Sequence, residues 1–97
     1  MTQTEYMAIK LFSTRYGTNL ITRFEKLQEE SNELIEAFND YINGKGTYEH
    51  LIEELSDVKA VLTHISGILN QDQDKLLLDA IVKSEIRNVI PNYKRKE

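Results

Sequence analysis

Residues 20–42 read LITRFEKLQEESNELIEAFNDYI, the longest regular pattern in the chain. Its apolar residues fall mostly three, four or seven positions apart, at Leu20, Phe24, Leu27, Leu34, Ile35, Phe38 and Ile42. This spacing puts them on one face of an α-helix and leaves the charged residues on the other. Asn19 is a suitable N-cap before the stretch, and a glycine-containing turn at 43–47 follows it. We therefore predict an amphipathic helix over 20–42.

The same helical periodicity continues on both sides of this stretch. We predict further helices over 4–16, 48–69 and 74–89. Gly17 is a candidate for ending the first of them, Thr47 is a candidate N-cap of the third, and Pro91 ends the last. No stretch alternates cleanly between apolar and polar residues, so no strand is predicted.

Apolar faces and short turns together define the expected fold class. The apolar residues in line along helix 48–69 are Leu51, Leu55, Val58, Leu62, Ile65 and Leu69, and those expected to face inward in helix 74–89 are Leu77, Leu78, Ile81 and Val82. Short connections favour antiparallel neighbours. We therefore predict an all-α, antiparallel bundle of about four helices. A short chain with this many amphipathic helices often completes its core by self-association, so a homodimer or homotetramer is expected.

The composition limits what the chain can do. With 97 residues, 40% of them hydrophobic and 29% charged, it suits a single domain and is too apolar to be fully disordered. It has no Cys, which excludes disulfides and a thiol nucleophile and suits a reducing compartment, so a cytoplasmic location is expected. No signal peptide or membrane span is recognised. The net charge of −4 argues against direct nucleic-acid binding.

An acidic motif occurs twice, 24 residues apart. The first copy is Leu27-Gln28-Glu29-Glu30-Ser31-Asn32-Glu33-Leu34, and the second is Leu51-Ile52-Glu53-Glu54-Leu55-Ser56-Asp57-Val58. At about 100° per residue, the second Glu and the last acid of each copy lie beside the apolar stripe of their helix. These residues are Glu30 and Glu33 in the first copy and Glu54 and Asp57 in the second. The first Glu of each copy, Glu29 or Glu53, faces further outward.

A hairpin of the two helices brings these flanks together. The two acid pairs are offset by only about one helical turn along such a hairpin. Four carboxylates near an apolar seam repel one another, and hard divalent ions such as Mg²⁺ or Mn²⁺ prefer carboxylate oxygen. The alternative interpretation is a solvated acidic face with no bound ion.

Neither histidine completes a familiar metal motif. His50 lacks the second His of an inverted zinc-protease motif, and neither acidic copy has the Glu-x-x-His of di-iron bundles. His64 falls on the same side of its helix as Asp57. It is expected to be an ordinary surface histidine rather than a support for a metal ligand.

The paired acidic motif resembles the signature of the MazG-like all-α nucleoside triphosphate pyrophosphohydrolases. That superfamily includes the dimeric dUTPases and the phosphoribosyl-ATP pyrophosphohydrolases. Its Glu-Glu-x-x-Glu and Glu-x-x-Asp elements correspond here to Glu29-Glu30-Ser31-Asn32-Glu33 and Glu54-Leu55-Ser56-Asp57, with twenty residues between them. The resemblance covers roughly residues 20 to 90. It implies one domain over 1–97, with a first helix within 1–18 and a basic tail at 91–97.

The resemblance implies a Mg²⁺-dependent enzyme, with Mn²⁺ as a possible substitute. Glu30, Glu33, Glu54 and Asp57 would hold the metal, and Glu29 or Glu53 would orient or deprotonate the attacking water. Lys83 and Arg87, on one face of the last helix, would contact phosphate. The substrate would be a canonical or non-canonical nucleoside triphosphate, cleaved to the monophosphate and pyrophosphate.

Aromatic residues offer a weaker signal about the base. Tyr6, Phe12 and Tyr16 could line a base pocket, but a core position for Phe12 and partly exposed tyrosines are the simpler expectation. Tyr93 in the tail could stack on a base or be a loose terminal residue. The competing functional hypothesis is a non-catalytic, acidic helical module for interaction or regulation.

Overall fold

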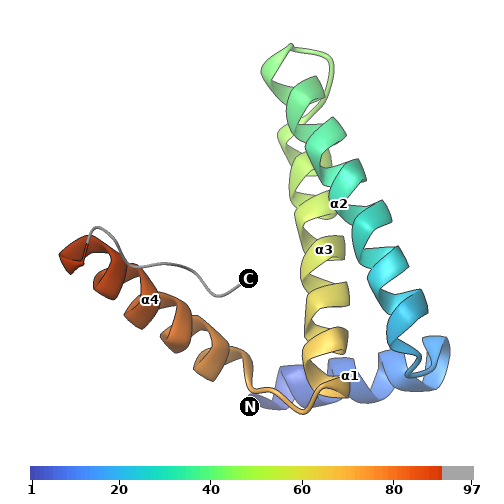
Figure 1. Ribbon diagram of the computed structural model, residues 1–97. Helices are drawn as coiled ribbons and strands as arrows, with labels where there is room; N and C mark the ends of the chain where they lie inside the picture. The colour runs from blue at the N-terminus through green and yellow to red at the C-terminus, as the bar shows by residue number, and fades with distance from the viewer. Residues whose placement is uncertain (91–97) are drawn as a thin grey trace.

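The computed structural model describes residues 1–90, which form four α-helices and no strand. The helices are α1 (Gln3–Tyr16), α2 (Leu20–Ile42), α3 (Tyr48–Ile68) and α4 (Gln73–Val89), coloured in chain order in Figure 1. The predicted all-α class is confirmed. The tail 91–97, with Tyr93, lies outside the described residues.

Local capping chemistry sets the helix ends. Asn19 Oδ1 accepts a hydrogen bond from the backbone N–H of Thr22 at 3.2 Å, and Thr47 Oγ1 accepts one from that of His50 at 3.1 Å. These contacts satisfy backbone donors that a helix start leaves free. Gly17 ends α1 with φ = 77°, a conformation that a side chain disfavours. The three caps predicted at 17, 19 and 47 are confirmed.

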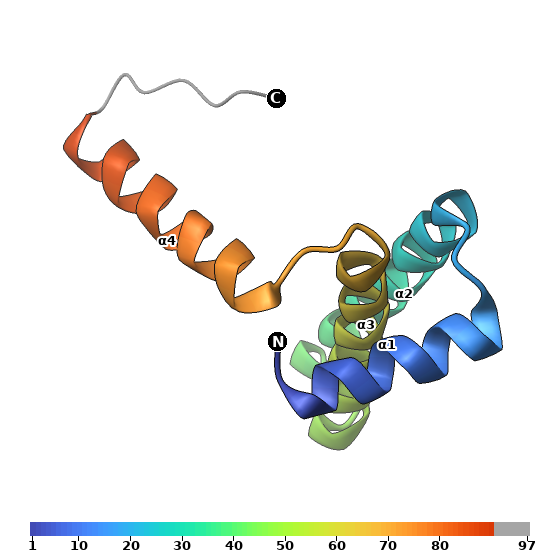
Figure 2. The same cartoon turned by 90° about the horizontal axis from the view of Figure 1, so that it is seen from below.

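Three of the helices pack together. α2 and α3 lie side by side and are joined at one end by the turn at 43–47 (Figure 1). α1 crosses the opposite end of this pair and packs against α3 (Figure 2). Gly67 permits the crossing, because a Cβ atom there would lie only 2.7 Å from the side chain of Ile9.

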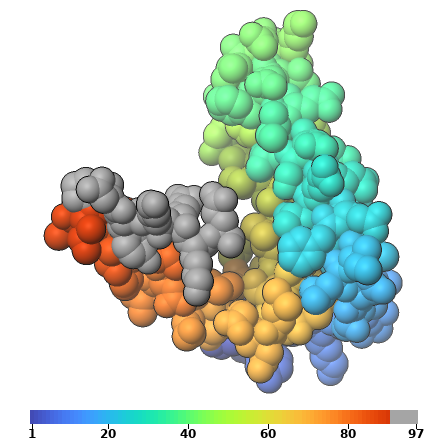
Figure 3. Space-filling model, in the orientation of Figure 1, coloured from blue at the N-terminus to red at the C-terminus, as the bar shows by residue number. Residues whose placement is uncertain are grey.

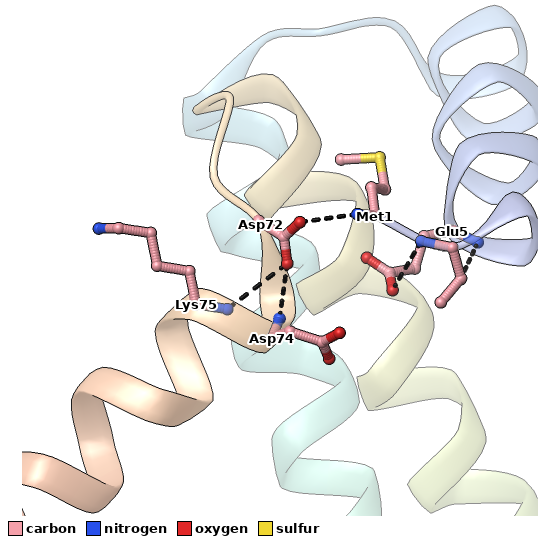
Figure 4. Close-up of polar contacts among 6 residues, drawn as sticks. Met1, Glu5, Asp72, Asp74 and Lys75 are labelled. Atoms are coloured by element: carbon pink, nitrogen blue, oxygen red, sulfur yellow. Dashed lines mark hydrogen bonds and ion pairs between the residues drawn. The ribbon is translucent and has the colours of Figure 1, made fainter.

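α4 extends away from the other helices as a separate arm (Figures 1 and 3). Its first turn is fixed by polar contacts. Asp72 Oδ1 accepts hydrogen bonds from the backbone N–H of Asp74 at 2.8 Å and of Lys75 at 3.4 Å (Figure 4). Asp72 Oδ2 lies 2.7 Å from the Met1 amino nitrogen (Figure 4), and Gln73 Nε2 donates to Thr63 Oγ1 at 2.9 Å. The base of the arm is therefore tied to α3 and to the start of the chain.

The apolar face of α4 has no partner within residues 1–90. Leu77, Leu78, Ile81 and Val82, expected to face inward, are all exposed. That prediction was wrong for the single chain, because periodicity shows that a face is apolar but not what covers it. In the described chain the buried apolar residues are Ala37, Val61 and Ile65. None of the helices in residues 1–90 has the length and apolarity needed to cross a membrane.

Candidate metal centre and adjoining pocket

The structure brings three carboxylates of the repeated acidic motif together. Glu30 and Glu33 from α2 and Glu54 from α3 each place an oxygen within 4.8 Å of the others. Glu30 and Glu33 are three positions apart and so share a face of α2. Glu54 comes from the facing helix because α2 and α3 are paired along their lengths. We call these three residues the acidic triad.

The triad is partly removed from water. The side chain of Glu30 is 10% exposed and that of Glu54 is 14% exposed. One oxygen of each, Oε2, is buried without a hydrogen-bond partner. Glu33 is exposed, and the negative charge of Glu30, with a smaller contribution from Glu54, raises the pKa of Glu33 above its ordinary value. Clustered carboxylates with unsatisfied oxygens are a set of ligands that a hard divalent cation would complete.

Lys26 supplies positive charge next to the triad. Its Nζ lies 3.1 Å from Glu30 Oε1 and 3.3 Å from Glu29 Oε1. The hydrogen bond to Glu30 is the main reason that the pKa of Lys26 is raised. One lysine leaves most of the negative charge of the triad uncompensated.

The outer acids of the two motif copies lie where the helical wheel predicts. The side chains of Glu29 and Glu53 are 60% and 76% exposed, in contrast to those of Glu30 and Glu54. His50 lies on the Glu53 side, with Nδ1 4.0 Å from Glu53 Oε2 and Nε2 3.7 Å from Glu54 Oε1. Glu29 and Glu53 are therefore accessible to solvent. This accessibility is needed for the role predicted for them, which is to orient an attacking water molecule.

Asp57 is placed differently from the other predicted metal ligands. It is exposed and lies outside the acidic triad. It shares with Glu30 the wall of a pocket of about 580 Å³ between α1, α2 and α3. The other residues of this wall are Phe12, Tyr16, Arg23, Lys26, Ala60 and Val61. Asp57 therefore lies on the α3 side of a pocket that Glu30, alone of the triad, also lines.

Two residues near this pocket were not predicted from the sequence as buried. Arg23 is 7% exposed, and its guanidinium carbon lies 4.9 Å from the centre of the Tyr16 ring. His64 is fully buried, and its Nε2 lies 3.1 Å from Ser13 Oγ. The expectation of a surface histidine was wrong, because α1 packs across α3 at this position. One feature of the sequence indicates that Arg23 belongs to the site: it lies seven positions before Glu30 and therefore on the same face of α2.

The predicted phosphate-binding residues lie on the arm. Lys83 and Arg87 belong to α4, which points away from α2 and α3 in Figures 1 and 2. Lys83 is exposed, and Arg87 is partly buried with its Nε unpaired in the described chain. Within one chain they are therefore not assembled with the acidic triad.

Comparisons of the chain with models of protein families, with curated proteins and with solved structures found no match. The relation to the MazG-like superfamily therefore stays a prediction that rests on the paired acidic motif.

Proposed function

We propose that the protein is a Mg²⁺-dependent nucleotide pyrophosphohydrolase of the MazG-like type. The observation that carries this proposal is the convergence of Glu30, Glu33 and Glu54 from two separate copies of one motif. A solvated acidic face does not require acids of two helices to meet with oxygens buried and unpaired. Mg²⁺ fits the oxygen-only donor set, and Mn²⁺ is the expected substitute.

In this proposal each acidic residue has a distinct task. The triad and Asp57 hold the ion, which neutralises phosphate charge and polarises the attacked phosphorus when it is bound. Glu29 or Glu53, each exposed and next in sequence to a member of the triad, orients or deprotonates the water that attacks the α-phosphorus. Pyrophosphate leaves and a nucleoside monophosphate remains. This chemistry depends on positioning and charge neutralisation, and it needs no covalent nucleophile.

We also propose that the site is completed in a homodimer or homotetramer. The apolar face of α4 has no cover within residues 1–90, and α1 and α2 also expose large apolar residues such as Met7 and Ile21. Faces of this kind mark interaction sites. In an oligomer, a second copy of the chain would cover the apolar face of α4 and the exposed apolar residues of α1 and α2. It also brings its α4, with Lys83 and Arg87, toward a triad that the same chain does not reach.

Pyrophosphate release with Mg²⁺, measured over a panel of canonical and non-canonical nucleoside triphosphates, tests the proposed reaction. Glu33→Gln and Asp57→Asn should abolish turnover while the helical content is retained. Glu36→Gln is the matched control, because Glu36 is an exposed acid on α2 outside the triad, and it should remain active. Full activity of E33Q and D57N, or no release from any substrate by the folded wild type, would instead favour the non-catalytic module.

A further inference from the structure

Arg23 is a buried cation without an anionic partner in the part of the chain that the structure describes. It is 7% exposed, its Nε has no hydrogen-bond partner, and no carboxylate of residues 1–90 lies within ion-pair distance of it. The ring of Tyr16 is its aromatic neighbour, at 4.9 Å. A buried guanidinium is costly unless its donors are satisfied, and a cation–π contact compensates only part of that cost. Because Arg23 also lines the pocket, its guanidinium group can present hydrogen-bond donors to a ligand there.

The position of Arg23 in the pocket indicates which part of a ligand it meets. Arg23, Lys26 and Glu30 follow one another on a face of α2, and Arg23 is about 10 Å along the helix from Glu30. Glu30 and Asp57 belong to the acidic part of the pocket wall, whereas Phe12 and Tyr16 add aromatic rings to the same wall. The pocket thus has an acidic end at Glu30 and Asp57 and an aromatic end, where the Arg23 guanidinium lies over the ring of Tyr16.

We propose that Arg23 is a specificity-determining residue that binds the nucleobase of the substrate. This inference rests on the function proposed above, which it deepens by assigning the base end of the pocket. With an ion held by the acidic triad, the phosphates would bind at that end of the pocket, and the base would lie against the wall formed by Phe12 and Tyr16. Arginine has no acceptor. Its guanidinium N–H groups therefore donate to a carbonyl oxygen or an unprotonated ring nitrogen on the edge of the base.

Kinetics of Arg23→Gln test this assignment, with Arg15→Gln as the matched control. Arg15 is an exposed arginine on α1 and does not line the pocket. R23Q should raise KM for the preferred nucleotide about tenfold or more, leave kcat within a few-fold, and reduce discrimination between bases. Its affinity for inorganic triphosphate with Mg²⁺ should equal that of the wild type. R15Q should match the wild type in every measurement.

Two outcomes would overturn the assignment. Unchanged KM and base discrimination in a folded R23Q would show that Arg23 does not contact the ligand. An equal loss of affinity for the nucleotide and for inorganic triphosphate would show that it binds phosphate and not the base.

A measurement on the wild type avoids dependence on the folding of R23Q. The NMR signal of the Arg23 Nε–H group should shift when nucleoside monophosphates are added and stay in place when inorganic triphosphate is added. Absence of a shift with every nucleotide would contradict the proposal. If the wild type hydrolyses nothing, the proposed reaction fails, and this titration still decides separately whether Arg23 binds a base.

Discussion

Glu33 lies where three carboxylates converge, and its titration should be visible in the stability of the metal-free protein. The charge of Glu30, with a smaller contribution from that of Glu54, raises its pKa in the folded state. The folded state therefore binds the proton more tightly than the unfolded state does. Stability attributable to Glu33 is greatest below its unfolded pKa of about 4.3 and decreases as pH rises through the higher folded pKa.

Melting temperatures of the wild type and Glu33→Gln, measured without metal between about pH 4 and pH 7, check this prediction. The wild type should lose stability relative to E33Q as pH rises, because only the wild type acquires the third negative charge. Under the proposed function, saturating Mg²⁺ should reverse the difference, because an ion held by the charged triad would stabilise the folded state. A difference between the two proteins that does not vary with pH would contradict the prediction.

His64 should give the opposite pH dependence. Burial, with a smaller contribution from the positive charge of Arg23, lowers its pKa in the folded state. The unfolded chain therefore takes up the proton first, and stability should fall as pH drops below about 6.5 toward the lower folded pKa. In thermal denaturation His64→Gln should lose this dependence. Ser13→Ala should keep it, because it removes the contact with His64 Nε2 but not the titrating ring. An unchanged pH profile in H64Q would refute the assignment to His64.

The sequence predicts the acidic residues of the site better than the basic and aromatic ones. Glu30, Glu33 and Glu54 lie beside the apolar stripes of their own helices, so local periodicity places them near the seam. Arg23 and His64 are buried because α1 crosses the end of the α2–α3 pair, an arrangement set by tertiary packing. No local pattern encodes the angle of that crossing.

The crossing of α1 over α3 depends on Gly67. An alanine there would place Cβ 2.7 Å from Ile9, closer than side-chain carbons ordinarily approach. Overpacking of this kind costs about 1–3 kcal/mol, and all but the lower end of this range exceeds the gain in helix propensity of about 1 kcal/mol. Chemical denaturation of Gly67→Ala should therefore show a net loss of stability. Ile9→Ala in the G67A background should cost less than in the wild type, and additive losses would contradict the proposed clash.

Helix boundaries could be predicted closely, whereas the environment of α4 could not. The starts of α2 and α3 match the prediction because Asn19 and Thr47 cap them through contacts local in sequence. The face of α4 formed by residues such as Leu77 and Ile81 is apolar as predicted, but one chain does not bury it. What covers a face depends on contacts outside the helix, and here we propose that they come from a second chain.

For the whole molecule, self-association should depend on α4. Ile81→Asp places a charge on its exposed apolar face, so this variant should sediment as a monomer at concentrations where the wild type is dimeric or tetrameric. Lys75→Ala, a polar change on the same helix, should leave the assembly intact. A wild type that is monomeric at every concentration, or an I81D variant that assembles normally, would refute the role of α4.

Assembly should also be visible in activity. If Lys83 and Arg87 act on the triad of a partner copy, a mixture of Arg87→Ala and Glu33→Gln proteins, each inactive alone, should regain part of the wild-type rate. An inactive mixture that forms mixed oligomers would show that the basic residues of α4 do not act across the interface.

Binding of the metal itself is the first property to establish, and Mn²⁺ can be followed directly by electron paramagnetic resonance. Titrating the wild type, Glu33→Gln and Glu36→Gln with Mn²⁺ distinguishes a specific metal site from general attraction of cations to an acidic surface. We predict saturable Mn²⁺ binding in the wild type and in E36Q, competition by Mg²⁺, and loss of binding in E33Q. Equal binding by all three proteins, or none by the wild type, would show that the acidic triad is not a metal centre.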